Sequence, residues 1–326
     1  MIGLTIDIDE TQGLDLKALD NMETKKSDIG NDRKPDPARF GKFTASTVHQ
    51  IMTGCDDTLD QKAEKIANSF KRKSELIKHA SRMGITIDKK DTMLGIGYKL
   101  VPYRTGQLSS GAKTYIRNKV IEDLTGEPIS EFTTFDTEYG KQMEGETVAY
   151  IEKLKGIKIH EALDDQVFHT TTPATTNGLK LAGHIGATPD GKYYPTDSNG
   201  SINKNIVFGF EGKAPKRETH WDYLFGWHTK SGTQTPPLTF ETMKQKVPNY
   251  YWQAIMGLYV TGWHGWTWVS YCPKFTIEAL KSVCFDIKTV DIWEDIKKME
   301  KYLLMAVDYK QGIMNGIING KSNNKI

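Results

Sequence analysis

The first half of the chain is patterned for helices. Between residues 41 and 156, apolar residues recur every three or four positions among charged ones, and several segments begin at Ser or Thr and end at Gly. This spacing predicts four helices, over residues 41–54, 59–83, 109–126 and 139–156. We expect Thr44 or Ser46 to cap the first of them.

The period changes in the second half. Short apolar runs bounded by Gly, Pro or Asn predict strands, over residues 165–172, 181–191, 205–215, 265–273 and 282–290. Apolar residues at helical spacing predict two further helices, over residues 247–262 and 291–313. Residues 226–246 have no period and are predicted to form a long loop. Helices that precede and then alternate with strands predict an α/β fold, with a central mixed β-sheet flanked by helices.

The two ends of the chain lack such a pattern. Residues 1–37 are predicted to be a flexible N-terminal arm, residues 38–315 a single domain, and residues 316–326 a frayed C-terminal tail. No internal repeat is evident in the pattern.

Composition narrows the class of protein. The formal net charge is only +2 over 326 residues, so any basic surface has to be local. Three scattered cysteines predict neither a disulfide framework nor the four thiolates of an iron–sulfur cluster. No apolar run reaches the roughly 20 residues that span a bilayer, and the first residues are acidic where a signal peptide is basic. We expect a soluble cytoplasmic protein with no membrane partner.

Residues 207–215, Val-Phe-Gly-Phe-Glu-Gly-Lys-Ala-Pro, end an apolar strand on two charged side chains. Residues two apart in a strand face the same side, so Glu211 and Lys213 are predicted to share a face. An acid two positions before a lysine is common in this chain, and Asp286 and Lys288 also fall in a predicted strand. The pattern therefore needs a second feature before it indicates a site.

That second feature is Asp190, in the turn sequence Pro-Asp-Gly one strand earlier. If strands 181–189 and 205–213 pair as a hairpin, Asp190 comes close to Glu211, and two such carboxylates repel unless a cation lies between them. Oxygen ligands favour a hard ion such as Mg²⁺ or Mn²⁺. Glu144, on a predicted helix, is a candidate third carboxylate. An ordinary turn aspartate and a surface glutamate are the alternatives.

Together these groups suit a metal-dependent hydrolase that acts on phosphodiesters. In such a site a metal ion activates water and stabilises charge on the phosphate. Lys213 would hold or help deprotonate the attacking water and stabilise the pentacovalent state.

The order of the motifs resembles the PD-(D/E)XK nuclease superfamily and, more narrowly, the phage lambda exonuclease / YqaJ-like viral recombinase family. The resemblance extends over about residues 39–273 and implies a restriction-endonuclease-like core. It is carried by five motifs in order: Arg39 with Thr44-Ala45-Ser46, Gly140 to Glu144, Pro189-Asp190-Gly191, Glu211-Gly212-Lys213-Ala214-Pro215, and Tyr250 to Gln253. Ala214 stands where the family usually has Cys, and the arm and the helix 59–83 have no counterpart that we can place.

The resemblance implies roles for these residues. Two Mg²⁺ ions, for which Mn²⁺ is expected to substitute, would be bound by Glu144, Asp190, Glu211 and the carbonyl of Gly212. Lys213 would serve catalysis, with Gln253 supporting the site. Arg39 and Ser46 would bind the 5′-phosphate of a DNA end, although by sequence alone they suit a surface arginine and a helix cap. Lys216 and Arg217 are candidates for contacts to the DNA backbone, or else a solvated charge pair.

The implied activity is Mg²⁺-dependent 5′→3′ exonuclease action on linear double-stranded DNA. Its 3′ single-stranded tails would serve recombination with a phage-type single-strand annealing protein. A ring-shaped trimer and a phage origin, hence the host cytoplasm, follow from the resemblance only. The alternatives are a RecB- or Cas4-like nuclease without an iron–sulfur cluster, a catalytically silent DNA-end-binding protein, and a sugar-active hydrolase with two carboxylates.

Overall fold

A computed structural model describes residues 36–55, 57, 59–88, 90–104, 108–129, 135–170, 180–196, 200–228 and 232–323. Most of the predicted N-terminal arm lies outside this range. Residues 36–326 group into one compact unit by their contacts. None of the described helices combines the length and the apolar composition that crossing a lipid bilayer requires.

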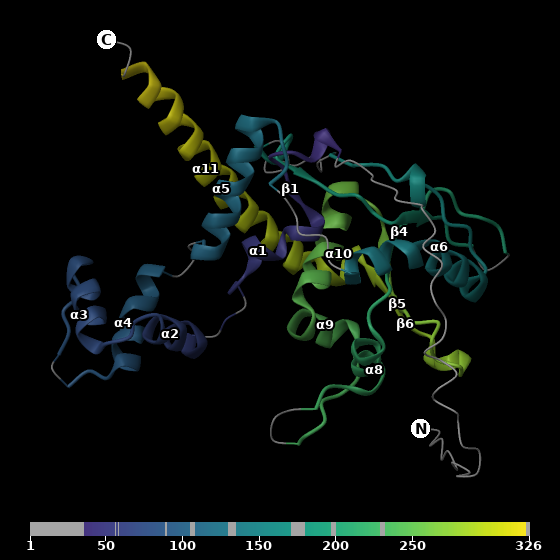
Figure 1. Ribbon diagram of the computed structural model, residues 1–326, viewed down its shortest axis with the longest axis horizontal. Helices are drawn as coiled ribbons and strands as arrows, with labels where there is room; N and C mark the ends of the chain where they lie inside the picture. Colours follow the sequence, from purple (N-terminus) through teal and green to yellow (C-terminus); the bar gives the residue numbers. More distant parts are fainter. Residues whose placement is uncertain are drawn as a thin grey trace. The chain divides into compact units, whose positions relative to one another are not determined.

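Helices fill the first half of the chain, as the pattern predicted (Figure 1). They are α1 (His49–Met52), α2 (Leu59–Asn68), α3 (Lys73–Arg82), α4 (Met93–Arg104), α5 (Ser110–Thr125) and α6 (Phe135–Lys155). Two short 3-10 turns, η2 (Pro37–Arg39) and η3 (Ala45–Thr47), precede α1. The boundaries of α5 follow from its ends, because the Ser109 side chain accepts a hydrogen bond from the Ala112 N–H and Gly126 ends the helix at φ 68°.

Two of the helix predictions in this half need correction, and one helix was missed. Residues 41–54 begin with a short strand, β1 (Phe43–Thr44), because it pairs in parallel with β2 (Ile185–Gly186). The helix predicted over 59–83 breaks into α2 and α3, since the chain is extended at Arg72, with φ −132° and ψ 141°. Helix α4 was not predicted at all. It contains two glycines and a proline, and it is fixed by packing on α2, where an added Cβ on Gly97 would lie 2.3 Å from the Ala63 carbonyl oxygen.

A mixed four-stranded sheet forms the centre of the second half. Its strands are β3 (Gly191–Tyr193), β4 (Phe208–Lys213), β5 (Gly265–Tyr271) and β6 (Ser282–Lys288), in that spatial order. Strands β4 and β5 are parallel, and the two outer pairs are antiparallel. The predicted α/β fold, with a mixed sheet flanked by helices, is confirmed.

The remaining elements differ from the prediction in detail. The helices of this half are α8 (Arg217–Phe225), α9 (Phe240–Lys246), α10 (Pro248–Thr261) and α11 (Trp293–Asn323), and short 3-10 turns form η4 (Leu163–Asp165), η5 (Glu278–Leu280) and η6 (Thr289–Ile292). The strand predicted over 165–172 is wrong for its described part, which contains only the last residue of η4 and a single bridge from His169 to Ala187. The predicted loop 226–246 contains α9, which begins with a capping box between Thr239 and Thr242. Helix α11 continues through residues predicted to be a tail.

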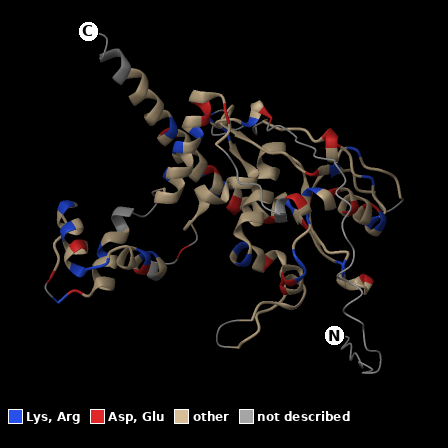
Figure 2. Cartoon of the chain, in the orientation of Figure 1, with Lys and Arg blue, Asp and Glu red and all other residues tan. Residues whose placement is uncertain are grey.

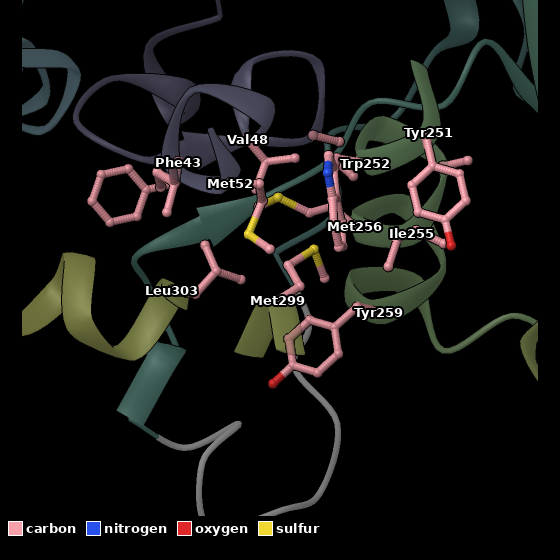
Figure 3. Packing of buried hydrophobic residues seen from close by; sticks show 14 of the residues in the cluster. Phe43, Val48, Met52, Tyr251, Trp252, Ile255, Met256, Tyr259, Met299 and Leu303 are labelled. Atoms are coloured by element: carbon pink, nitrogen blue, oxygen red, sulfur yellow. The ribbon is translucent and has the colours of Figure 1, made fainter. Parts of the chain in front are cut away.

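Helix α10 is the centre of the larger core. All ten residues from Tyr251 to Val260 are buried, because this helix packs against the sheet on one side and against α1, α9 and α11 on others. Figure 3 shows Trp252 and Met256 among Met52 and Met299 of neighbouring helices. The opposite face of the sheet is covered by α6, whose Ile151 packs with residues of β4 and β5. The sheet is therefore a buried layer between α6 and α10.

Trp266 of β5 joins the sheet to α10. Its ring lies between two glycines, and an added Cβ on either Gly209 of β4 or Gly257 of α10 would lie 2.3 Å from a ring atom. Trp266 and Gly209 are also paired directly in the register of the sheet. The two glycines thus determine how closely α10 approaches β4 and β5.

We predict that Gly257→Ala destabilises the protein by about 1–3 kcal/mol, because the added methyl group overpacks the Trp266 ring. Glycine to alanine within a helix ordinarily stabilises by roughly 1 kcal/mol. Gly312→Ala is the matched control, since Gly312 lies in α11 with no atom within 4 Å of its added Cβ. Thermal unfolding should move the two midpoints in opposite directions. Equal shifts would show that the Trp266 contact does not limit the packing.

Candidate active site

Strand β4 carries Glu211 and Lys213 to the face that α10 covers. Glu211 is only 2% exposed. Its Oε1 atom accepts a hydrogen bond of 2.6 Å from Nε2 of Gln253 in α10, and it also accepts one from Nζ of Lys213. The predicted sharing of one face by Glu211 and Lys213 therefore holds, and α10 adds Gln253 to the same carboxylate.

Asp190 lies next to this pair, at the start of β3. Its N–H donates to the Phe210 carbonyl at 3.0 Å, and its Oδ2 atom accepts from the Gly212 N–H at 2.9 Å. The sequence predicted this proximity through a hairpin of strands 181–189 and 205–213. The observed pairing uses residues 191–193 instead, with Gly191 opposite Phe210.

Glu144 reaches the same region from α6. Gly212 allows α6 to approach, because an added Cβ would lie 2.9 Å from Cγ2 of Thr147, one turn beyond Glu144. Oε1 of Glu144 accepts a hydrogen bond of 2.6 Å from Nε2 of Gln166. Gln166 was missed in the sequence, since it lies in a segment predicted to be a strand and no motif marks it.

Two cavities meet at Asp190 and Lys213. The smaller, of about 210 Å³, is lined by Arg39, Thr44, Ala45, Ser46, Gln166, Thr188, Asp190, Glu211, Lys213 and Gln253. The larger, of about 410 Å³, is lined by Tyr139, Gly140, Lys141, Glu144, Thr147, Asp190, Phe210, Gly212, Lys213, Ala214, Pro215, Lys216, Thr219 and Tyr250. Of the residues to which the sequence analysis gave a role in the site, all except Arg217 line one of these two cavities. Arg217 is exposed at the first position of α8.

Burial dominates the electrostatics of the cluster. Desolvation, and then the neighbouring Asp190 carboxylate, raises the pKa of Glu211 to about 8. Desolvation also raises the pKa of Asp190, against the opposing charge of Lys213. Burial works against the charge of Lys213, but the carboxylates of Glu211 and Asp190 raise its pKa. Lys213 is thus the resident cation of the cluster, and the raised pKa of Glu211 means that this carboxyl group gives up its proton less readily than an exposed one.

The donor set suits a hard cation only in part. Oε2 of Glu211 and Oγ1 of Thr188 are buried without a hydrogen-bond partner, and both residues line the smaller cavity. Such buried oxygens need a ligand, and carboxylate oxygen suits Mg²⁺. Among the described residues, however, no three His, Cys, Asp or Glu side chains are grouped so that they could hold a metal ion. Asp190 and Glu211 are the carboxylates beside the smaller cavity, and Glu144, whose charge acts on Glu211, is hydrogen-bonded to Gln166.

Comparison with known proteins gives only distant likenesses. No family model matches the chain, and no curated protein matches it. Among solved structures, an alkaline exonuclease (LHK-Exo) from Laribacter hongkongensis shows 16% identity and a TM-score of 0.47, over 86% of this chain and 96% of that one. LHK-Exo in complex with dAMP shows 17% identity and a TM-score of 0.48, over 87% of this chain and 96% of that one. A phage-related exonuclease from Haemophilus somnus 129PT shows 13% identity and a TM-score of 0.46, over 85% of this chain and 96% of that one. At these values the likeness assigns no role to any residue.

We predict that Glu211→Gln flattens the pH dependence of stability in the metal-free protein. The pKa of Glu211 lies at about 8 in the folded state against 4.5 ordinarily, so between these values the folded protein keeps a proton that the unfolded chain releases. The contribution of Glu211 to stability should therefore fall as pH rises through this window, and Glu211→Gln should remove that fall. Chemical denaturation in chelator at several pH values measures the slope. Glu146→Gln, at an exposed position of α6, is the control, and identical slopes in all three proteins would contradict the assignment.

Proposed function

We propose that the protein is a Mg²⁺-dependent 5′→3′ exonuclease acting on the ends of linear double-stranded DNA. One observation carries the proposal. A single cavity is lined both by anion-binding groups, Arg39 and Ser46, and by the carboxylates of Asp190 and Glu211. The motifs that place these residues in order along the chain are those of the lambda exonuclease / YqaJ-like family.

An anion in this cavity would be attracted by Arg39 and repelled by the carboxylates, unless a cation is bound with it. Arg39 presents a guanidinium that matches the oxygens of a phosphate, whereas the carboxylates repel it. A divalent cation between carboxylate and phosphate removes the conflict. A phosphodiester with Mg²⁺ is the ligand that uses the whole cavity.

Asp190 and Glu211 would hold the ion, with Glu144 and the Gly212 carbonyl completing the two-ion set that the family motifs imply. Mg²⁺ supplies Lewis-acid stabilisation of the negative charge that builds up on the phosphate. Glu211 has to be ionised for this role, against the raised pKa that burial gives it. A bound cation would favour that ionised form.

Lys213 is the residue that acts on water and phosphate. Its ammonium lies beside Glu211 and above the Tyr250 ring, 5.5 Å from the ring centre, at the junction of the two cavities. There it would hold the attacking water and stabilise the charge of the pentacovalent state. Gln253 positions Glu211 through its 2.6 Å hydrogen bond.

The polarity follows from the 5′-phosphate role of Arg39 and Ser46. Water would attack the phosphorus between the first two nucleotides, and the bond from phosphorus to the 3′ oxygen would break. The released nucleotide keeps its 5′-phosphate and gains a 3′-hydroxyl, and the shortened strand ends in a new 5′-phosphate. The group that Arg39 binds is thus regenerated at every step. The rest of the strand would leave through the larger cavity, past Lys141 and Lys216.

The 3′ single-stranded tails left by such an enzyme are substrates for a phage-type single-strand annealing protein, which we propose as the partner. A ring trimer around the duplex is the proposed assembly. Both extend the family resemblance and rest on no contact within this chain.

A catalytically silent DNA-end-binding protein is the second candidate. Two observations favour it: the ion pair between Lys213 and Glu211, and the absence of a metal-binding group of three side chains among the described residues. This protein would bind a 5′-phosphate through Arg39 and Ser46 without cleaving. The digestion below separates the two functions.

We predict that the protein, in Mg²⁺, erodes the 5′-phosphorylated strand of a linear duplex from its 5′ end. The duplex carries a 5′-phosphate at one end only and a different label on each strand. Lys213→Ala should lower the rate at least about 100-fold, since it removes a charge that stabilises the transition state. EDTA should abolish cleavage.

The controls isolate each part of this result. Arg39→Ala should lose the preference for the phosphorylated end, whereas Arg117→Ala, at an exposed position of α5, should keep it. Survival of the duplex in both Mg²⁺ and Mn²⁺, with end binding retained, would overturn the nuclease and support the end-binding protein. Cleavage that persists in EDTA would support a metal-independent hydrolase.

We predict that Gln166→Ala raises the Mg²⁺ concentration needed for half-maximal cleavage by about 10- to 100-fold, because Glu144 loses the donor that orients it. Gln142→Ala is the matched control, an exposed glutamine on α6. Titration of Mg²⁺ at saturating DNA measures the effect. An unchanged Mg²⁺ requirement in Gln166→Ala would show that Glu144 does not depend on Gln166.

A further inference from the structure

Helices α2, α3 and α4 form a small module with a core of its own, defined here as the helical module, residues 59–104. Its buried residues make a cluster separate from the core around α10, and they are Ala63, Ile66, Leu76, Ala80, Ile96, Leu100 and Val101. The close approach of Gly97 to Ala63 fixes α4 against α2. The module therefore presents its outer side chains from a packed support, although no predicted role in the site uses it.

Positive charge is concentrated in the helical module. Residues 59–104 contain eleven Lys or Arg and five Asp or Glu, a formal charge of +6, whereas the other 280 residues together carry −4. Figure 2 shows Lys and Arg distributed over α2–α4. The formal net charge of +2 is thus the sum of a basic module and a weakly acidic remainder of the chain.

Two of the three lysine and arginine residues of α3 point away from the module core. Lys78 and Arg82 are one turn apart, and they are exposed on the side of α3 opposite to Leu76 and Ala80, which are buried. Lys71, in the bend before α3, is also exposed.

These three cations have no ion pair among the described residues. Lys65 and Lys99 of the same module, by contrast, are paired with Asp57 and Asp91 at 2.6 Å. Glu75 is the one exposed acid between Lys71 and Arg82, and it pairs with none of these three. A run of about 15 Å along α3 therefore carries three cations outside any ion pair among the described residues, against the single carboxylate of Glu75.

We propose that this face of the helical module, centred on Lys71, Lys78 and Arg82, binds the phosphate backbone of duplex DNA without reading its sequence. Regularly spaced phosphates complement such a row of cations, and release of their counterions provides affinity. The choice of DNA among polyanions rests on the proposed function. The site is distinct from the carboxylate cluster, since none of its residues lines either cavity there.

The side chains around the cations separate this ligand from a lipid surface. Ser74 and Ser81 accompany them on the exposed surface of α3, and the apolar residues of the helix are directed into the module. A helix that binds a membrane places large apolar side chains beside its basic residues, where they enter the lipid. This face has none, so its attraction is purely electrostatic and suits a duplex.

The test uses the full chain and a 30-base-pair blunt duplex with a fluorescent label and no 5′-phosphate, in EDTA so that no cleavage occurs. Anisotropy gives the affinity at several salt concentrations. The triple variant Lys71→Ala, Lys78→Ala, Arg82→Ala should bind roughly 10- to 100-fold more weakly at low salt, with a salt-dependence slope smaller by about 2–3. Lys153→Ala, Lys301→Ala, Arg117→Ala is the matched control, with three exposed cations outside the module.

A charge-retaining variant guards against misfolding. Lys71→Arg, Lys78→Arg, Arg82→Lys should bind like wild type. Equal binding of the duplex by the alanine triple variant and its control would overturn the inference. The inference would also fail if the alanine triple variant lost binding to phosphatidylserine vesicles but kept its binding to DNA. The outcome is independent of catalysis. If the triple variant binds DNA more weakly but the wild-type protein does not cleave, the binding surface is supported and the proposed nuclease is overturned. If the triple variant binds DNA normally and the wild-type protein cleaves, the nuclease is supported and the binding surface is overturned.

Discussion

The burial of one carboxylate constrains the whole site. Glu211 is enclosed between β4 and α10, and a charge held there is unfavourable unless it is neutralised or paired. Its Oε1 atom is satisfied by Lys213 and Gln253, whereas Oε2 has no partner. The fold thus holds an oxygen atom that a bound cation, a proton or a hydrogen-bond donor could satisfy. The raised pKa of Glu211 expresses the same constraint.

The packing around the sheet is what makes this enclosure possible. Gly212 lets α6 approach one face of β4, and Gly209 with Gly257 lets the Trp266 ring hold α10 against the other. The side chains of Glu211 and Lys213 consequently emerge into a fixed space rather than into solvent. The dense core around Trp252 and Met256 leaves α10 little freedom to move away (Figure 3). Rigidity of this kind suits a site in which charges must stay close together.

Charge is divided between two parts of the described chain. The carboxylate cluster lies beside the four-stranded sheet, and three lysine and arginine side chains outside any ion pair among the described residues lie on α3 and the bend before it, in the helical module. For a polyanionic substrate, this division separates affinity from chemistry. Backbone contacts to the module would supply binding that depends on salt, while Asp190, Glu211 and Lys213 would determine what happens at the strand end.

The sequence by itself determined the periodic elements and the strand that carries Glu211 and Lys213. It also predicted Asp190 beside them, but through a hairpin of residues 181–189, whereas the strand that pairs with β4 is formed by residues 191–193. It missed α4 and the break between α2 and α3, since local propensity there is weak and the contacts of Gly97 and Leu76 decide. Only the tertiary structure joined Gln166 to Glu144 and brought Arg39 into the cavity of Glu211, because these approaches depend on packing between segments far apart in the chain.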